Sequence, residues 1–163
     1  MSAYRVTVGK EALVFAAAHF ITFGNGGCEP LHGHNYRVGV ELAGELGRDS
    51  LVHDFVALRR DMHSLLGELD HRVMLPTSNP ELELEAGPGQ VEVRHSTRRY
   101  VFPESDVVLL PVSNTTAERI AEYLGRRMQD LLGSAWGGKI FRVEVEVEEA
   151  PGQSATWTDE ARS

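Results

Sequence analysis

Several protein classes are excluded by what the sequence has little of. Among 163 residues there is one cysteine, Cys28, so no disulfide can form within the chain, and a lone thiol fits a reducing compartment. Every apolar run stays well short of the roughly 20 residues that a membrane-spanning helix needs. Residues 1–8 have the composition of a β-strand and not of a secretory signal peptide. We therefore expect a cytoplasmic protein that has no membrane partner.

Positive charge is also scarce. The chain has 16 Lys and Arg residues against 24 Asp and Glu residues, which gives a formal net charge of −8. Proteins that bind nucleic acids without sequence preference need a basic surface that displaces counterions from the phosphates. A nucleic-acid partner is therefore not expected. The hydrophobic fraction of 42% and the chain length instead predict a single domain, residues 1–163, with a buried core.

The expected strands and helices follow each other in an order typical of the α+β class. Strands are indicated by alternation of apolar and polar residues or by a high content of β-branched and aromatic residues. These segments are residues 4–20 (one strand or a bent pair), 34–43, 141–148 and 154–158. Asp54 is the expected N-cap of a helix over residues 55–67. Its apolar stripe consists of Phe55, Leu58, Met62, Leu65 and Leu66.

A second helix and an insertion complete the pattern. Thr115 opens the helix through a Ser/Thr-x-x-Glu capping box, and Gly133 ends it. Residues 76–112 contain five prolines and a Gly-Pro-Gly turn followed by an alternating segment, which predicts an inserted surface β-hairpin. The arginines of this segment either attract phosphate or belong to a solvated charged face, and the second reading is preferred; they are Arg94, Arg98 and Arg99.

Three histidines are spaced so that they can meet at one metal ion. Residues i and i+2 of a strand face the same side, so His32 and His34 can converge. His19 lies at the end of the preceding strand, and the glycine-rich loop 22–31 can bring it alongside. Three imidazoles leave a fourth tetrahedral position open, as in catalytic zinc sites. The alternative, in which the histidines only pack, stays open on spacing alone.

Five short motifs resemble the 6-pyruvoyltetrahydropterin synthase family. They occur in the family's order, in residues 15–19, 28–36, 69–71, 114–118 and 149–157. Thr115 stands where the family usually has proline. Outside residues 76–112 the resemblance covers nearly the whole chain, and it implies a tunnelling fold (T-fold), a four-stranded antiparallel sheet with two helices on one face. It also implies a homo-oligomer, commonly a hexamer built as a dimer of trimers, with active sites at the subunit interfaces.

The resemblance also implies a ligand set and a substrate. His19, His32 and His34 would bind Zn²⁺, and the substrate would be a dihydropterin with a hydroxylated side chain, typically dihydroneopterin triphosphate. The zinc would act on the side-chain hydroxyls as a Lewis acid. Cys28 would remove a proton, which requires a thiol pKa lowered by a nearby cation. Whether the substrate of this chain is phosphorylated is left open by the sequence.

The remaining expected site residues also come from the resemblance. Asp70 and His71 would form a second proton-transfer pair, with the carboxylate orienting the imidazole. Glu149 would hold the pterin ring through two hydrogen bonds, with Thr116 as a supporting contact. Taken without the resemblance, Asp70 and His71 are an ordinary polar pair at a helix end, and Glu149 is a strand end that reaches water.

Two neighbouring residues connect the chain with two branches of the family. The spacing of Cys28 from His32 resembles 6-carboxytetrahydropterin synthase of queuosine biosynthesis, which is the preferred reading. Glu29 resembles a subgroup that uses glutamate at this place and releases 6-hydroxymethyldihydropterin for folate synthesis. Both activities in one enzyme are a further alternative. An inactive pterin-binding protein and a metal hydrolase with Glu29 as its base complete the alternatives.

Overall fold

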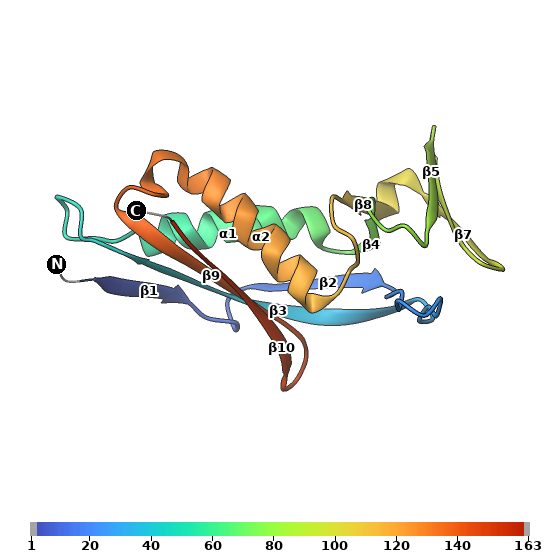
Figure 1. Ribbon diagram of the computed structural model, residues 1–163. Coiled ribbons are helices and arrows are strands. Elements are labelled where there is room, and N and C mark those ends of the chain that lie inside the picture. The colour runs from blue at the N-terminus through green and yellow to red at the C-terminus, as the bar shows by residue number, and fades with distance from the viewer. Residues whose placement is uncertain (1–2, 162–163) are drawn as a thin grey trace.

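A computed structural model describes residues 3–161 of the chain and has the predicted α+β architecture. Two helices, α1 (Phe55–Leu69) and α2 (Ala117–Leu132), lie on the same face of a long twisted sheet (Figure 1). The strands of this sheet are β1 (Tyr4–Val8), β2 (Val14–His19), β3 (His32–Gly44), β4 (Arg72–Pro76), β8 (Val107–Leu110), β9 (Ile140–Ala150) and β10 (Gln153–Glu160). Within residues 3–161, neither helix is long and apolar enough to cross a membrane.

In the part of the chain that the structure describes, the main sheet has seven strands, more than the four that the family resemblance implies. The hydrogen-bonded order is β10-β9-β3-β2-β4-β8, and β1 also pairs with β3. The antiparallel part, β2, β3, β9 and β10, corresponds to the predicted sheet, and β1 with β2 is the predicted bent pair. β4 and β8 add to the edge of β2 in parallel orientation. β4 leads into the inserted segment and β8 lies near its end, so the insertion adds a strand to the main sheet.

The first helix begins at the predicted residue, and it ends two residues beyond the predicted end. The carboxylate of Asp54 accepts a hydrogen bond from the backbone N–H of Val56 at 3.0 Å and so caps α1. The apolar stripe is buried except for Phe55, which is 53% exposed. Phe55 is the first residue of the helix, before the helix turns its apolar side to the sheet.

The second helix begins one residue later than the capping box predicts. The hydroxyl oxygen of Thr116, not of Thr115, accepts the N–H of Arg119 at 3.4 Å. Thr115 is fully buried, and its hydroxyl donates to the carbonyl oxygen of Phe20 at 3.1 Å. The predicted N-cap is therefore wrong by one position, because Thr115 is used to connect α2 with the end of β2. Gly133 ends the helix as expected, with a φ of 53°.

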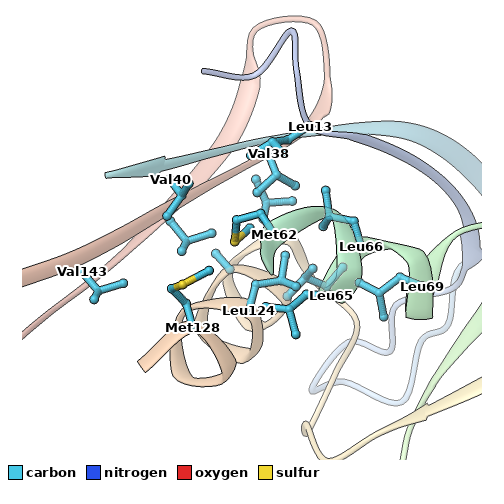
Figure 2. Close-up of a cluster of buried hydrophobic side chains, with 14 of the residues drawn as sticks. Leu13, Val38, Val40, Met62, Leu65, Leu66, Leu69, Leu124, Met128 and Val143 are labelled. Atoms are coloured by element: carbon cyan, nitrogen blue, oxygen red, sulfur yellow. The ribbon is translucent and has the colours of Figure 1, made fainter. Parts of the chain in front are cut away.

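The core lies between the two helices and the sheet. Figure 2 shows side chains from both layers pointing toward one another, with methionines filling the space between the helices and the sheet. The labelled residues are Leu13, Val38, Val40, Met62, Leu65, Leu66, Leu69, Leu124, Met128 and Val143. Each is at most 3% exposed. Burying one such aliphatic side chain stabilises the folded protein by about 1.5–3 kcal/mol. The packed core therefore holds in place the strands that carry the site described below.

The inserted segment is a three-stranded sheet and not the predicted hairpin. Its strands are β5 (Glu83–Gly87), β6 (Gln90–His95) and β7 (Arg98–Pro103), in the order β5-β6-β7. Figure 1 shows β5 and β7 at the end of the molecule opposite to both termini. A second apolar cluster attaches this sheet to the end of β2, where the ring of Tyr100 stacks on Phe20 at 5.6 Å. The hairpin prediction missed β7 because its sequence, Arg-Arg-Tyr-Val-Phe-Pro, begins with two charged residues and ends with proline.

Candidate active site

The pairing of β2 with β3 brings the three predicted histidines together. His19 lies directly opposite His32, and Ala17 lies opposite His34. The ring centres of His19 are 4.8 Å from His32 and 5.2 Å from His34, and those of His32 and His34 are 4.8 Å apart. The register of one antiparallel pair thus places all three imidazoles on the same side of the sheet.

Hydrogen bonds to backbone carbonyls determine which ring nitrogen faces the cluster. Nδ1 of His19 lies 2.8 Å from the carbonyl oxygen of Thr115, and Nδ1 of His32 lies 2.8 Å from that of Pro30. Because a carbonyl oxygen only accepts, both Nδ1 atoms carry a proton, and a neutral ring held in this way has its lone pair on Nε2. This arrangement, with Nδ1 held by a carbonyl, is the usual outer contact of metal-binding histidines.

Burial of the ring nitrogens fits a metal site as well. Within residues 3–161, Nε2 of His19 and Nε2 of His34 are buried and have no hydrogen-bond partner. Burial lowers the pKa of His19, an effect only partly offset by its hydrogen bond to Thr115. A neutral imidazole with an unpaired, buried lone pair is costly unless something coordinates it. The donor set therefore fits a divalent ion that accepts nitrogen ligands, such as zinc.

A carboxylate joins the three imidazoles. Ligand atoms of His19, His32, His34 and Glu149 all lie within 4.8 Å of one another. One carboxylate oxygen of Glu149 is 3.2 Å from Nε2 of His34, but the two atoms are not aligned as a hydrogen bond. Glu149 also lines a hollow of about 550 Å³ together with Thr116. The residue predicted to hold the pterin thus lies beside the predicted metal ligands, and Thr116 borders the same hollow.

Cys28 and Glu29 point in different directions. The thiol of Cys28 donates to the carbonyl oxygen of Glu29 at 3.4 Å, and its side chain packs against the second apolar cluster. The carboxylate of Glu29 accepts the backbone N–H of Ile21 at 3.1 Å and lies 3.9 Å from Nε2 of His32. Of the two candidate bases, the carboxylate is therefore the one that faces the histidines.

The expected lowering of the Cys28 pKa is not found. Burial raises the pKa of this thiol, and the nearby guanidinium of Arg98 offsets the effect only in part. A cation is present as expected, but the apolar surroundings of the sulfur outweigh it. Activation of the Cys28 thiolate therefore stays a prediction, because in the chain by itself the sulfur is packed against the insertion and burial raises its pKa.

Asp70 and His71 form the expected pair at the end of α1. A carboxylate oxygen of Asp70 is 2.9 Å from Nδ1 of His71, and the other accepts the backbone N–H of Ala16 at 2.8 Å. The hydrogen bond from Ala16, followed by that from His71, lowers the pKa of Asp70. The side chain of His71 is 83% exposed, and it lines an open hollow of about 430 Å³ with His34. Among residues 3–161, the metal-donor cluster contains neither Asp70 nor His71.

Three contacts of the site were not predicted. The carbonyl group of Thr115 holds His19, and Asn114 holds the turn after β2 by donating its amide to the carbonyl oxygen of Thr22 at 2.8 Å. Backbone carbonyls leave no signature in a sequence, so only the departure from proline at Thr115 marked this position. The third unpredicted contact, from Arg98 to the Cys28–Glu29 segment, is described below.

Comparisons with known proteins found a matching family and named relatives. The family model described as 6-pyruvoyl tetrahydropterin synthase matches residues 8–160. A Methanocaldococcus jannaschii protein, named a putative 6-carboxy-5,6,7,8-tetrahydropterin synthase, is 34% identical over 146 residues, which cover 89% of each chain. A Pyrococcus horikoshii protein of the same name is 31% identical and covers 84% of this chain and 80% of its own.

Solved structures match 98% of the chain. The 6-pyruvoyl tetrahydropterin synthase of Plasmodium vivax is 28% identical with a TM-score of 0.89, and the match covers 98% of this chain and 99% of that one. The Plasmodium falciparum enzyme is 31% identical with a TM-score of 0.88 over the same shares. Two further structures of the P. vivax protein carry alanine or cysteine in place of a glutamate described as its catalytic residue.

Proposed function

The chain belongs to the 6-pyruvoyl tetrahydropterin synthase family, and we propose that it is a zinc-dependent lyase that cleaves the side chain of a dihydropterin. The proposed reaction is that of 6-carboxytetrahydropterin synthase. It converts dihydroneopterin triphosphate and water into 6-carboxytetrahydropterin, acetaldehyde and triphosphate, as a step of queuosine biosynthesis. The names of the archaeal relatives support this choice. The observation that carries it is the convergence of three imidazoles and a carboxylate within 4.8 Å.

The histidines of β2 and β3 would hold the metal. Ligand atoms of His19, His32 and His34 lie within 4.8 Å of one another, and contacts with backbone carbonyls hold the rings of the first two. Bound zinc would supply Lewis-acid polarisation of the substrate side-chain hydroxyls. The protein's contribution is rigidity, because the register of the β2–β3 pair and the carbonyl contacts allow the rings little rotation.

Glu149 would hold the pterin. An ionised carboxylate accepts two hydrogen bonds from the amino and ring N–H groups of a pterin in a bidentate arrangement. Its place in the hollow of about 550 Å³, next to Thr116 and beside the histidines, supports this role. A substrate anchored there would direct its side chain toward the metal site.

Proton transfer would involve the Cys28–Glu29 segment and the Asp70–His71 pair. In the proposed reaction the thiol of Cys28 removes a proton, and Asp70 keeps His71 oriented for the second transfer through their 2.9 Å contact. The high exposure of His71 is consistent with the proposal that a second copy of the chain completes the site. The assembly would be a homo-oligomer in the cytoplasm, a hexamer made of two trimers.

One observation favours a second candidate reaction. Glu29, and not Cys28, faces His32, at 3.9 Å. The catalytic glutamate named for the P. vivax enzyme shows that a glutamate serves in a structurally similar protein. With Glu29 as the acid–base group, the enzyme would release 6-hydroxymethyldihydropterin for folate synthesis, alone or beside the carboxytetrahydropterin reaction.

A product assay separates these proposals. Zinc-loaded protein is incubated with dihydroneopterin and, separately, with its triphosphate, and the products are identified by mass spectrometry. Acetaldehyde with 6-carboxytetrahydropterin supports the first proposal, and 6-hydroxymethyldihydropterin supports the second. Binding without turnover would refute both and leave an inactive pterin-binding protein. Loss of phosphate without any carbon–carbon cleavage would point to a metal hydrolase.

A further inference from the structure

One arginine of the inserted sheet reaches the Cys28–Glu29 segment. Arg98, the first residue of β7, donates through Nη1 to the carbonyl oxygen of Cys28 at 3.0 Å and to that of Glu29 at 2.8 Å. Arg98 lies 70 positions after Cys28 and 69 positions after Glu29 in the sequence. A guanidinium is planar and always charged, so it fixes two acceptors more rigidly than an ammonium group does.

The neighbouring arginines make different contacts. Arg94 and Arg99 both pair with Glu92 inside the inserted sheet, and Arg99 does so through two hydrogen bonds of 2.9 and 2.6 Å. They therefore form part of a solvated charged face, as the sequence suggests. Of the three arginines considered as phosphate ligands, Arg98 is the one that contacts the main body of the protein.

The opposite side of the Cys28–Glu29 segment is fixed by the end of β2. The N–H of Glu29 donates to the carbonyl oxygen of Ile21 at 2.9 Å, and Thr22 forms a β-bridge with Cys28. The segment is thus held between two backbones, one from β2 and one from the insertion. Consecutive residues of an extended segment point to opposite sides, so a segment held in this way sends one side chain to the histidines and the other to the insertion.

The contact of Arg98 also bears on the thiol. The carbonyl oxygen of Glu29 that accepts from Arg98 also accepts from the thiol of Cys28. The charged groups close enough to act on the pKa of this thiol are Arg98, Glu29 and Glu81. Arg98 opposes the rise of the Cys28 pKa that burial causes, whereas both carboxylates add to it.

We propose that Arg98 is a positioning residue of the active site, by which the inserted sheet fixes the orientation of the Cys28–Glu29 pair so that the carboxylate meets the histidines. This inference rests on the proposed function, in which one of these two side chains transfers a proton. It assigns the insertion a role in selecting which of the two groups reaches the substrate.

The test compares Arg98→Ala and Arg98→Lys with Arg99→Ala in the zinc-loaded, full-length protein. Misplacing an acid–base group by about 1 Å lowers turnover about 100-fold, so we expect kcat of Arg98→Ala to fall between about 10-fold and 100-fold with KM little changed. The ratio of 6-carboxytetrahydropterin to 6-hydroxymethyldihydropterin should change as well. Arg98→Lys should recover part of kcat, and Arg99→Ala should match the unaltered protein in both readouts.

A second readout does not depend on turnover. The rate of Cys28 alkylation by iodoacetamide is measured against pH without substrate. Loss of the Arg98 cation should shift the midpoint of this profile upward, Arg98→Lys should move it back, and Arg99→Ala should leave it unchanged. This midpoint tests whether Arg98 contacts the Cys28 segment in solution, even if no pterin is turned over. Absence of turnover by itself would refute the proposed function and not the contact. If Arg98→Ala fails to fold, Arg98→Lys still carries the test through its product ratio and its alkylation midpoint.

The inference is overturned if Arg98→Ala equals Arg99→Ala in kcat, product ratio and alkylation midpoint. An equal loss of kcat in both variants would also overturn it, because that would indicate a general effect of charge on the inserted sheet. Zinc content, measured for every variant, should stay unchanged, since neither arginine contacts a histidine of the cluster in residues 3–161.

Discussion

The role of Glu149 offers a sharp test, because β9 carries a natural control next to it. Glu148 and Glu149 are consecutive and face opposite sides of the strand. Glu148 is ion-paired with Lys10 at 2.8 Å, away from the histidines, whereas Glu149 lies 3.2 Å from Nε2 of His34. Glu149→Gln and Glu148→Gln therefore make the same chemical change on the two sides of one strand.

The expected size follows from the proposed bidentate contact. The substitution Glu149→Gln keeps one acceptor oxygen but replaces the other by an NH₂ group that faces a pterin donor. A hydrogen bond to a charged group contributes about 1.5–3 kcal/mol, so KM should rise about 10-fold to 150-fold. Zinc content should stay near that of the unaltered protein, because three imidazoles remain. Glu148→Gln loses a partly exposed ion pair, which solvent screens, and should leave KM unchanged.

Steady-state kinetics and metal analysis on the same samples separate the possible outcomes. An unchanged KM in Glu149→Gln would refute its role in binding the pterin. Loss of zinc with a proportional loss of kcat would show instead that Glu149 is a metal ligand. Equal effects of the two substitutions would refute the argument from strand alternation.

Three further predictions concern proton transfer, pH and packing. Cys28→Ala should abolish the formation of 6-carboxytetrahydropterin while zinc stays bound. Glu29→Gln should lower the formation of 6-hydroxymethyldihydropterin about 100-fold or more. If product analysis shows neither loss, both residues are excluded as bases. Asp70→Asn should lower the free energy of unfolding at pH values above 3.8, the ordinary pKa of the carboxyl group, because the folded protein lowers the pKa of Asp70. The stability that Asp70 contributes is lost as the pH falls through this lowered pKa. Chemical denaturation that shows the same difference between the variant and the unaltered protein at every pH would contradict this. Gly125→Ala should destabilise the protein by about 1–3 kcal/mol, because its new methyl group meets the indole ring of β10. Gly67 lies in α1 and faces open space, so Gly67→Ala should stabilise the protein by up to about 1 kcal/mol. Similar melting temperatures for the two variants would refute the packing argument.

The sequence predicted those parts of the fold and site that depend on local periodicity. Alternation in residues 34–43 and a helical stripe after Asp54 correspond to β3 and α1, since both signals come from neighbours along the chain. The convergence of His32 and His34 is likewise a consequence of strand geometry. The fold class and the family membership, expected from motif order, are confirmed by the comparisons.

Features that depend on long-range packing were not predictable. The parallel addition of β4 and β8 to the sheet depends on contacts between segments some 30 positions apart, which no local pattern encodes. The helix cap shifts from Thr115 to Thr116 because tertiary contact with Phe20 uses the first hydroxyl. The direction of the Cys28 side chain depends on the inserted sheet, and a sequence gives no indication that Arg98 would contact this segment.

The most direct test of the account is the metal content of the purified protein. Elemental analysis should find about one zinc ion per chain, and His34→Ala should lose it, whereas the exposed His63→Ala on α1 should retain it. The proposed site predicts that zinc added to metal-free protein restores both binding and activity. A protein that holds no metal as purified and gains neither binding nor turnover when zinc is added would contradict the central claim.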